Sequence, residues 1–563
     1  MKASRLTVAT MILLALPVLE VAPAAAAPRR TRAAAAAKVV APTHQARVAA
    51  LGTLRPPLEE RGRTKPTTAA ERIADQIAAL YRGPLRAGTT SLLVVDARTG
   101  APVFAVEPDL PLNPASNVKL VSTAAALDLL GPDYRYQTRI LGRSPDADGV
   151  VAGDLYLLGS YDPTLGAAQV RALGAQLAAA GVKAVTGDIV VGATATRDGI
   201  YRALIPVDII AGAPGQPPQV STPLGYDFLT VDVAATTGKG KKGRLTYREE
   251  YRADEVGRRR LHLTVGGKLG KGKAFTHWVW TRERGLHAAH MVRAGLRDVG
   301  VQVGGDVKIE ELDGYVARAA GAGWLPFELA RHQSAPLAEI VAWVNKRSIN
   351  WLADRVIMTA AAQVAGEKPD MARALESMYA WLGTKAGATG GDVVLDTGSG
   401  LSYQTRLSAR HIVDGLRAAA ASPTSGPAFM QSLSIAGQDG TLRHRFLHTP
   451  VAGRLRGKTG TLSTVIALSG FLEVAPDRPL AFAIVSNGHS PGLRTRIRGA
   501  HEKLVGLLCE YLAATAPPTA PAAIAPVAAA PVTPSSTNSS VPPESDAVTT
   551  GFAARNASSV TRP

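Results

Sequence analysis

Ser116 and Lys119 are three positions apart and have the residue types of a nucleophile and a base. Residues three apart share one face of a helix, so the serine hydroxyl and the lysine amine can meet there. The helix N-terminus and a second lysine nearby both disfavour a positive charge on Lys119, which makes a neutral, proton-accepting amine accessible near neutral pH. An isolated Ser-x-x-Lys is usually a helix cap beside a solvated lysine, so this prediction depends on two further motifs.

Those motifs follow later in the chain as Ser348-x-Asn350 and Lys458-Thr459-Gly460. The Ser348 hydroxyl can relay a proton between the base and a leaving amine, and the Asn350 amide can hold a peptide carbonyl. Lys458 and Thr459 offer a cation and a hydroxyl to a terminal carboxylate, while Gly460 lets a substrate backbone approach a strand edge. Each motif alone is explained as well by a surface turn, but together they predict one serine-nucleophile site.

The sequence around each motif predicts an element that can position it. Residues 91–95 and 102–106 are β-prone and predict a hairpin, and an apolar pattern from Pro114 to Leu130, closed by Gly131, predicts a helix with Ser116 in its first turn.

The other two motifs also lie beside periodic segments. An amphipathic stretch at 337–345 precedes Ser348, and helical spacing continues after Asn350. Residues 458–474 and 480–485 predict two adjacent antiparallel strands, with Lys458 at the start of the first.

At this level of detail the sequence resembles the class C low-molecular-mass penicillin-binding proteins, the D-Ala-D-Ala carboxypeptidase and endopeptidase family. The resemblance extends from about Ala70 to Leu512. Besides the three motifs it includes the segments 153–159, 162–165, 398–402 and 435–443. The resemblance implies that the substrate is hydrolysed through an acyl-enzyme intermediate and that penicillins also acylate the enzyme. It implies no metal and no other cofactor.

The resemblance also implies a role for each residue. Ser116 would attack the penultimate D-alanine carbonyl with Lys119 as the base, and Ser348, Asn350 and Lys458 would complete a proton network. Thr459 would hold the terminal carboxylate, beside Gly460, and the backbone amides of Ser116 and Thr461 would form the oxyanion hole. Asp162 stands where the family has an aspartate that faces the free amino group of the substrate.

The spacing of the motifs predicts a split catalytic domain. Ser116 and Ser348 are 348 − 116 = 232 residues apart, so a large insertion must separate them. The family fold is an α/β, serine β-lactamase/transpeptidase-like sandwich, an antiparallel sheet flanked by helices. We expect residues 68–142 and 326–513 to form it, with a mainly β insertion at 143–325.

The two ends of the chain predict export. Residues 1–27 combine basic residues, an apolar stretch and small-residue cleavage sites, as in a secretory signal peptide, and we expect a periplasmic protein without a stable transmembrane anchor. Residues 28–67 read as a basic disordered linker and 514–563 as a disordered Pro/Ala/Ser/Thr tail. Cys509 is the single cysteine, which excludes an intrachain disulfide.

Basic residues exceed acidic residues by 63 − 45 = 18. Part of this excess lies in the linker and part in two clusters, Lys239 to Arg244 and Arg258 to Arg260. Both clusters flank β-prone runs and are interpreted as charged hairpin turns, which favours solvated loops over an attachment to the anionic wall or membrane. Export argues against a nucleic-acid partner, and the expected partners are peptidoglycan stem peptides, their cross-links and β-lactams.

Three positions depart from the family pattern. Ile349 stands where a polar residue is common, and Gly192 replaces an aspartate that usually follows the preceding strand. Tyr403 stands where an arginine usually helps to recognise the side-chain carboxylate of a diaminopimelate-type peptide. Either this charge is missing or Arg406, three residues later, supplies it.

Two other classes of protein compete with the peptidase. A secreted β-lactamase would share the acylation chemistry but has no use for the long insertion. A non-catalytic wall-binding relative would be expected to have lost one of the three motifs, whereas this chain keeps all of them.

Overall fold

The computed structural model describes residues 68–192, 204–222, 227–255, 257, 259–281, 284–366, 368–388, 393–474 and 478–515. The predicted signal peptide and basic linker, and all but the first two residues of the predicted tail, lie outside this part of the chain.

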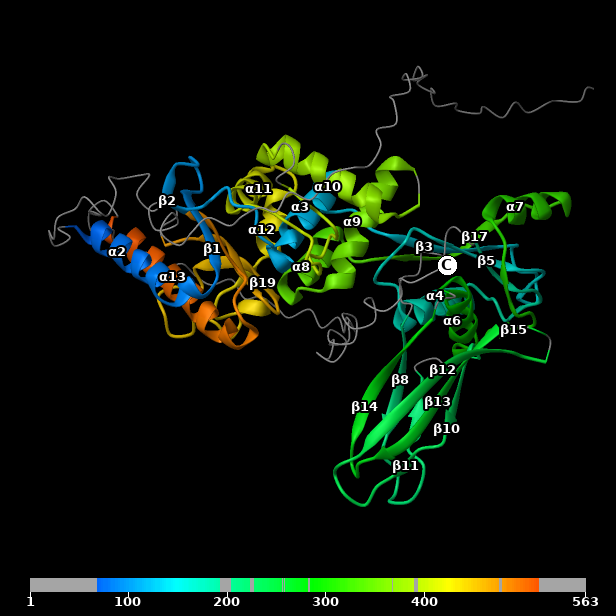
Figure 1. Ribbon diagram of the computed structural model, residues 1–563. Helices are drawn as coiled ribbons and strands as arrows, with labels where there is room; N and C mark the ends of the chain where they lie inside the picture. Colours follow the sequence, from blue (N-terminus) through cyan, green and yellow to red (C-terminus); the bar gives the residue numbers. More distant parts are fainter. Residues whose placement is uncertain are drawn as a thin grey trace, which may run out of the picture. The chain divides into compact units, whose positions relative to one another are not determined.

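A six-stranded sheet joins the two ends of the described chain (Figure 1). Its strands, all antiparallel, are in spatial order β18 (Ser434–Ile435), β19 (Leu455–Leu462), β20 (Val465–Leu472), β21 (Leu480–Asn487), β1 (Thr89–Asp96) and β2 (Pro102–Val106). The predicted hairpin at 91–95 and 102–106 corresponds to β1 and β2. The predicted strand at 458–474 is wrong as a single strand, because the Ser463-Thr464 turn divides it into β19 and β20.

Both faces of this sheet are buried, because successive strand residues point to opposite sides. In β1, Leu92 and Val94 belong to one apolar cluster, and Leu93 and Val95 belong to another. The first cluster lies under α2 (Ala69–Arg82) and α13 (Arg494–Ala514). Helices from the middle of the chain cover the second, which gives the predicted helix–sheet–helix sandwich.

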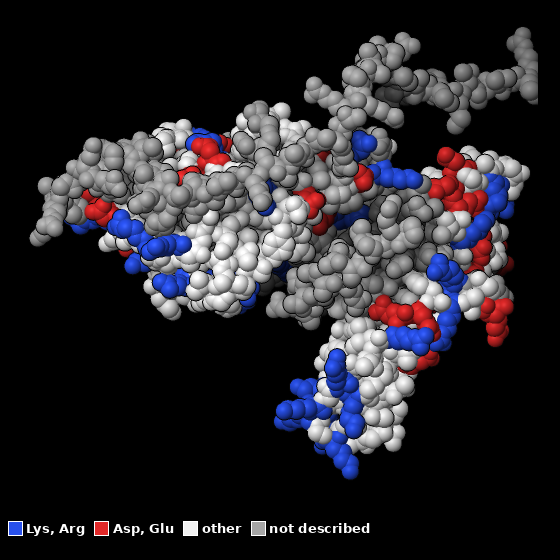
Figure 2. Space-filling model, in the orientation of Figure 1, with Lys and Arg blue, Asp and Glu red and all other residues white. Residues whose placement is uncertain are grey.

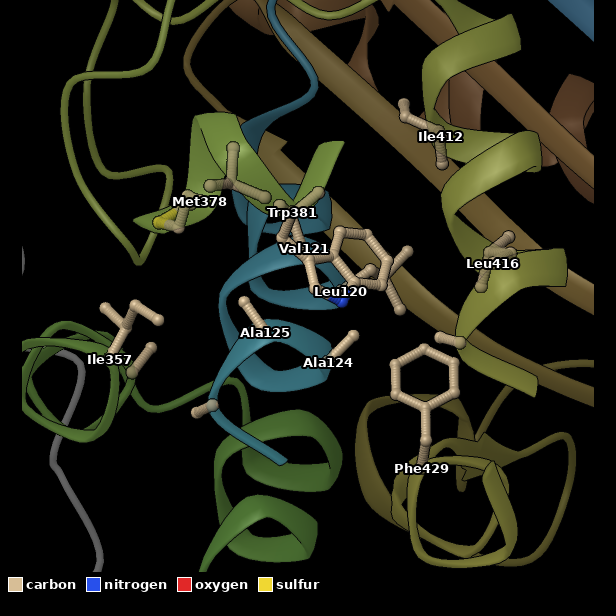
Figure 3. Close-up of a cluster of buried hydrophobic side chains, with 14 of the residues drawn as sticks. Leu120, Val121, Ala124, Ala125, Ile357, Met378, Trp381, Ile412, Leu416 and Phe429 are labelled. Atoms are coloured by element: carbon tan, nitrogen blue, oxygen red, sulfur yellow. The ribbon is translucent and has the colours of Figure 1, made fainter. Parts of the chain in front are cut away.

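The helix that carries the first motif lies at the centre of the second cluster. Figure 3 shows Leu120, Val121, Ala124 and Ala125 on α3 (Val118–Leu130), surrounded by apolar side chains of its neighbours, among them Trp381. Those neighbours are α8 (Leu337–Arg347), α9 (Asn350–Ala365), α10 (Met371–Ala386), α11 (Ala409–Ala421) and α12 (Gly426–Ser432). A helix buried on all sides has little freedom to shift, so its first turn is held rigidly.

Short 3₁₀ turns complete this part of the fold. They are η2 (Pro84–Ala87), η3 (Ala115–Asn117), η4 (Gly440–Leu442) and η5 (Pro491–Leu493). Of these, η3 leads directly into α3 and contains Ser116.

The insertion contains a second, five-stranded sheet, ordered β16 (Val307–Ile309), β7 (Ile189–Val191), β5 (Leu155–Gly159), β3 (Gln137–Gly142) and β17 (Phe327–Gln333). Strands β3 and β17 pair with each other along their lengths, although our boundaries at 142 and 326 assign both to the catalytic part. Backbone pairing ties them to the insertion, so we propose that the catalytic part ends near Tyr136 and resumes near Ser334.

The remainder of the insertion is strand-rich, and its described residues also include three helices. Small sheets are formed by β4 (Val150–Val151), β6 (Ala184–Val185) and β15 (Gln302–Val303), by β8 (Leu204–Ile210), β9 (Gln219–Ser221) and β14 (Ala274–Trp280), and by β10 (Leu229–Val233), β11 (Thr236–Thr237), β12 (Arg244–Ala253) and β13 (Arg259–Leu269). The helices are α4 (Ala167–Ala179), α6 (Arg284–Asp298) and α7 (Leu312–Gly321). Within the described residues, no helix combines the length and apolar character required to cross a bilayer.

Candidate active site

Ser116 lies in η3, where the chain enters α3 through an unusual backbone conformation. Ala115 has φ +48°, which is uncommon for a residue with a side chain, and its amide donates to Asn113 Oδ1 at 2.8 Å. Asn117 Nδ2 donates to Ser469 Oγ on β20 at 2.9 Å. These two side-chain hydrogen bonds fix the turn on both sides of Ser116, so its position is set by the sheet as well as by α3.

Lys119 is completely buried below Ser116. Its Nζ lies 3.0 Å from Ser116 Oγ, 2.7 Å from Asn350 Oδ1 and 2.7 Å from the Ser399 carbonyl oxygen. The amide and carbonyl oxygens can only accept hydrogen bonds. If Lys119 is deprotonated, an amine that donates to both of them can direct its lone pair to the Ser116 hydroxyl, which is the arrangement a base requires.

Asp354, which the sequence analysis did not single out, fixes the third partner of Lys119. Its Oδ1 accepts from the Ser399 amide at 2.7 Å, and Ser122 Oγ donates to the Gly398 carbonyl at 2.7 Å. Burial raises the pKa of the Asp354 carboxyl, and the positive charge of Lys119 opposes that rise. A sequence signal existed, because Asp354 follows Asn350 by one helical turn on α9.

The second motif lies at the junction between α8 and α9. Ser348 ends α8 in the left-handed conformation, with φ +57°, and Asn350 begins α9. Between them the Ile349 side chain is directed into the apolar cluster around α3, where it is 8% exposed. An apolar residue at this position therefore contributes to the core and leaves both polar neighbours free to face the site.

The third motif brings a second buried lysine. Lys458 Nζ donates to Ser348 Oγ at 2.8 Å and to the Thr459 carbonyl at 2.9 Å. Desolvation, and secondarily the charge of Lys119, lower the pKa of Lys458 well below its usual value. Thr459 Oγ1 donates to Thr441 Oγ1 at 2.9 Å, a partner that the sequence analysis included in a matching segment but gave no role.

Gly460 is required by the packing of β19 against η3. A Cβ atom at this position would lie 2.6 Å from the Pro114 carbonyl oxygen and 3.2 Å from Ala115 Cβ. Because backbone cannot yield as a flexible side chain can, only glycine permits this approach. The contact places the third motif directly beside the residue that precedes Ser116.

One edge of β19 is open next to the site. The neighbouring strand β18 pairs only with Arg456 and Gly457, so from Lys458 to Leu462 this edge has no strand partner in the described chain. Thr461, the predicted oxyanion-hole residue, lies in this open stretch and pairs with Ile466 on its other side. An open edge offers backbone donors and acceptors to an extended peptide.

Asp162 lies in the insertion, and its hydrogen bonds among the described residues do not reach the three motifs. It is fully buried, and its Oδ1 accepts from the Thr164 amide at 2.7 Å and from the Thr164 hydroxyl at 2.6 Å. Its Oδ2 lies 3.6 Å from His332 Nε2. Burial raises the pKa of the Asp162 carboxyl despite these contacts.

Tyr403 and Arg406 differ in where their polar atoms are directed. The Tyr403 side chain is 52% exposed, and its hydroxyl lies 2.6 Å from Ser463 Oγ in the β19–β20 turn. Arg406 Nη1 donates to the Tyr403 carbonyl at 2.7 Å and to the Thr405 carbonyl at 2.8 Å. Arg406 thus stabilises the loop backbone, and the hydroxyl of Tyr403 links that loop to β19.

The sequence profile of the D-Ala-D-Ala carboxypeptidase 3 (S13) family matches residues 73–202 and 199–506, which is most of the chain. The chain belongs to this family. It is a serine-type peptidase with the mixed α/β, transpeptidase-like fold that the sequence predicts. This match confirms the prediction that the chain is a class C low-molecular-mass penicillin-binding protein. Among the described residues of this S13 peptidase, no cluster of three or more His, Cys, Asp or Glu side chains could hold a metal ion.

Relatives of this S13 peptidase are known in several bacteria. A D-alanyl-D-alanine carboxypeptidase of Actinomadura sp. strain R39 is 29% identical over 481 residues, which cover 79% of this chain and 86% of the relative. The D-alanyl-D-alanine carboxypeptidase DacB of Haemophilus influenzae is 24% identical over 399 residues, which cover 67% of this chain and 81% of the relative. The crystal structure of penicillin binding protein 4 from H. influenzae, complexed with a β-lactam, matches the fold with a TM-score of 0.60 and 21% identity, covering 78% of this chain and 99% of that one.

Proposed function

We propose that this S13 peptidase is a D-Ala-D-Ala carboxypeptidase, an endopeptidase, or both, and cleaves peptidoglycan peptides through a serine acyl-enzyme. The observation that carries the proposal is the pair of buried lysines, each in contact with one serine hydroxyl: Lys119 with Ser116 at 3.0 Å and Lys458 with Ser348 at 2.8 Å. Two serine–lysine pairs supply a nucleophile, its base and a separate proton relay.

Acylation begins when the neutral Lys119 amine takes the Ser116 proton and Oγ attacks the penultimate D-alanine carbonyl. The C–N bond then breaks, and the leaving amine of the terminal D-alanine gains the proton that Lys119 took from Ser116, relayed through the Ser348 hydroxyl, which Lys458 contacts. The backbone amides of Ser116 and Thr461 hold the developing oxyanion, a contribution of about 3 to 4 kcal/mol for each donor. Water then attacks the ester and restores the Ser116 hydroxyl.

Substrate binding uses the open edge of β19. An extended peptide placed along Lys458 to Leu462 would direct its terminal carboxylate to Thr459 and Lys458, and Asn350 would hold a peptide carbonyl. The same pocket accepts a β-lactam, whose ring carbonyl takes the place of the peptide carbonyl and acylates Ser116.

Asp162 is our candidate for recognising the free ammonium of the peptide. Its Oδ2 accepts no hydrogen bond among the described residues, and an ammonium would bind there beside His332, whose Nε2 lies 3.6 Å away. Its complete burial requires the loop around it to move before substrate can reach it. Asp162→Asn should raise the KM of peptides with a free side-chain amine more than that of a simple acylated D-Ala-D-Ala; equal changes for both would assign Asp162 a structural role.

The predicted signal peptide supports export, so we place the enzyme in the periplasm, where peptidoglycan cross-links are accessible. Its partners there are stem peptides and, as covalent inhibitors, β-lactams, without a nucleic acid and without a cofactor.

The test is the mass of the intact protein after incubation with benzylpenicillin, together with D-alanine release from a D-Ala-D-Ala peptide. We expect a stable adduct of one penicillin on the wild type and on Ser144→Ala, which alters an exposed serine of the insertion. Ser116→Ala should show neither adduct nor release. Labelling of Ser116→Ala would place the nucleophile elsewhere, rapid penicillin turnover would indicate a β-lactamase, and an unlabelled wild type would indicate a non-catalytic relative.

A further inference from the structure

Two basic loops of the insertion lie side by side at one end of β12 and β13. The first carries the predicted cluster Lys239, Lys241, Lys242 and Arg244, and the second carries Lys268, Lys271 and Lys273. Arg244 pairs with Lys268 across the two strands, and the Lys271 amide donates to the Gly240 carbonyl at 2.8 Å. We call these seven residues the basic tip; Figure 2 shows Lys and Arg side chains gathered at this end of the insertion.

Glycine allows the two loops to approach so closely. A Cβ atom on Gly243 would lie 2.4 Å from the Lys268 carbonyl oxygen, and one on Gly270 would lie 2.3 Å from the Lys241 carbonyl oxygen. The loops therefore pack backbone against backbone, and the cations project outward from a defined framework. The four cationic side chains of the first loop therefore lie close to the three of the second.

The charge of the basic tip is not neutralised by ion pairs within the described chain. All seven side chains are exposed, and within the described chain none of them forms an ion pair. Neither 234–248 nor 265–280 contains an aspartate or a glutamate. The prediction of a solvated turn is wrong for the other cluster: Arg258 lies outside the described residues, and Arg260 is in β13, paired with Asp254 at 3.2 Å and with Asp306 at 3.0 Å. Arg260 thus belongs to the interior of the insertion, whereas the basic tip gathers seven exposed cations that form no ion pair within the described chain.

Exposed apolar side chains accompany these cations. Phe275, two residues after Lys273, is 40% exposed, and Ile210, at the end of β8, is 48% exposed. Strands β8 and β14 pair with Ala274 opposite Ile210, and the Ala211 amide donates to the Lys273 carbonyl at 2.9 Å. An exposed aromatic and an exposed aliphatic side chain therefore lie at the same end of the insertion as the lysines, on opposite faces of the β8–β14 pair.

We propose that the basic tip docks the enzyme on a bilayer surface rich in anionic phospholipids. Lysine and arginine side chains near such a surface are attracted to its phosphates, by about fivefold in affinity for each cation. Phe275 and Ile210 enter the headgroup region, which favours a membrane over an anionic wall polymer, because a polymer offers no apolar layer to them. The proposal rests on the export that the proposed function includes.

The experiment measures binding of the chain to vesicles by co-sedimentation. The protein is produced without residues 1–27, so that the apolar leader cannot itself insert, and the vesicles are either phosphatidylcholine alone or a 60:40 mixture of phosphatidylcholine and phosphatidylglycerol. The tip variant changes Lys241, Lys242, Lys271 and Lys273 to Gln. The control variant removes the same charge at four other exposed lysines, Lys183, Lys368, Lys385 and Lys503. The basic linker is the same in both.

We expect wild type and control to bind the mixed vesicles and not the neutral ones, and the tip variant to bind the mixed vesicles at least about tenfold more weakly. Phe275→Ser with Ile210→Ser should reduce the binding that remains at high salt. Penicillin acylation should be unchanged in every variant, so a failure of docking can be told apart from a failure of the proposed chemistry. Equal losses in tip and control variants, or tip-dependent binding to isolated walls but not to vesicles, would overturn the proposal.

Discussion

Lys458 Nζ lies 2.8 Å from Ser348 Oγ, and the lysine is completely buried. Ser348 itself occupies a left-handed backbone conformation at the end of α8. A buried amine and a strained serine both cost stability, and both belong to the proposed catalytic site. This contact joins two motifs that are distant in the sequence. We expect it to lower the stability of the fold while it serves catalysis.

Lys458→Met should therefore increase stability while it removes activity. The lowered pKa of Lys458 means that the unfolded chain binds more protons, so this lysine destabilises the native state below its unfolded pKa of about 10.4. Methionine of similar volume removes that cost, and we expect a gain of about 1 to 3 kcal/mol at neutral pH and a loss of at least about 100-fold in acylation rate.

The pH dependence supplies the check. As pH rises toward about 10, the wild type should gain stability relative to Lys458→Met, because its unfolded state then loses the extra proton. Thermal unfolding at several pH values measures this difference, and a constant difference would show that Lys458 is not desolvated as described.

Asp354 should act as a positioning residue for Lys119. Asp354→Asn keeps an oxygen that can accept from the Ser399 amide but removes a negative charge, which favours the neutral Lys119 amine. We expect near-normal acylation with its acidic limb displaced to lower pH. Asp354→Ala loses the hydrogen bond as well and should acylate about tenfold more slowly. The pH profile of penicillin acylation measures both effects, and identical profiles for the two variants would contradict this role.

Gly460→Ala should damage both the fold and the site. Its Cβ would lie 2.6 Å from the Pro114 carbonyl oxygen, so β19 or η3 has to shift, at a cost of about 1 to 3 kcal/mol. Acylation should fall because Ala115, beside the proposed nucleophile Ser116, is displaced. Gly499→Ala is the matched control: it lies in α13 with open space around it and should stabilise the protein by about 0.5 to 1 kcal/mol. Chemical denaturation should show a lower free energy of unfolding than the wild type for Gly460→Ala and a higher one for Gly499→Ala.

Tyr403 occupies the proposed side-chain subsite in place of an arginine, and Arg406 is bound to loop carbonyls. We therefore expect peptides with amidated and free-carboxylate diaminopimelate side chains to be cleaved at similar rates. Steady-state kinetics with the two peptides measures this. A strong preference for the free carboxylate that disappears in Arg406→Ala, but not in Arg410→Ala, would transfer the recognition to Arg406.

The sequence alone determined the chemistry, because residue types and local spacing encode it. Ser116 and Lys119 share a helix face wherever that helix lies, and the predicted helix from Pro114 to Leu130 corresponds to η3 and α3. Local signals failed where they were weak: the Ser463-Thr464 turn has no Gly, Asn or Asp, so β19 and β20 were predicted as one strand.

Only the tertiary structure decided which distant segments meet. Asp354 reaches Lys119 through the backbone of Ser399, and β3 pairs with β17 across the whole insertion. The two lysine-rich loops likewise become one surface only when β12 pairs with β13. Such contacts depend on how several buried faces pack at once, and no local spacing along the chain specifies them.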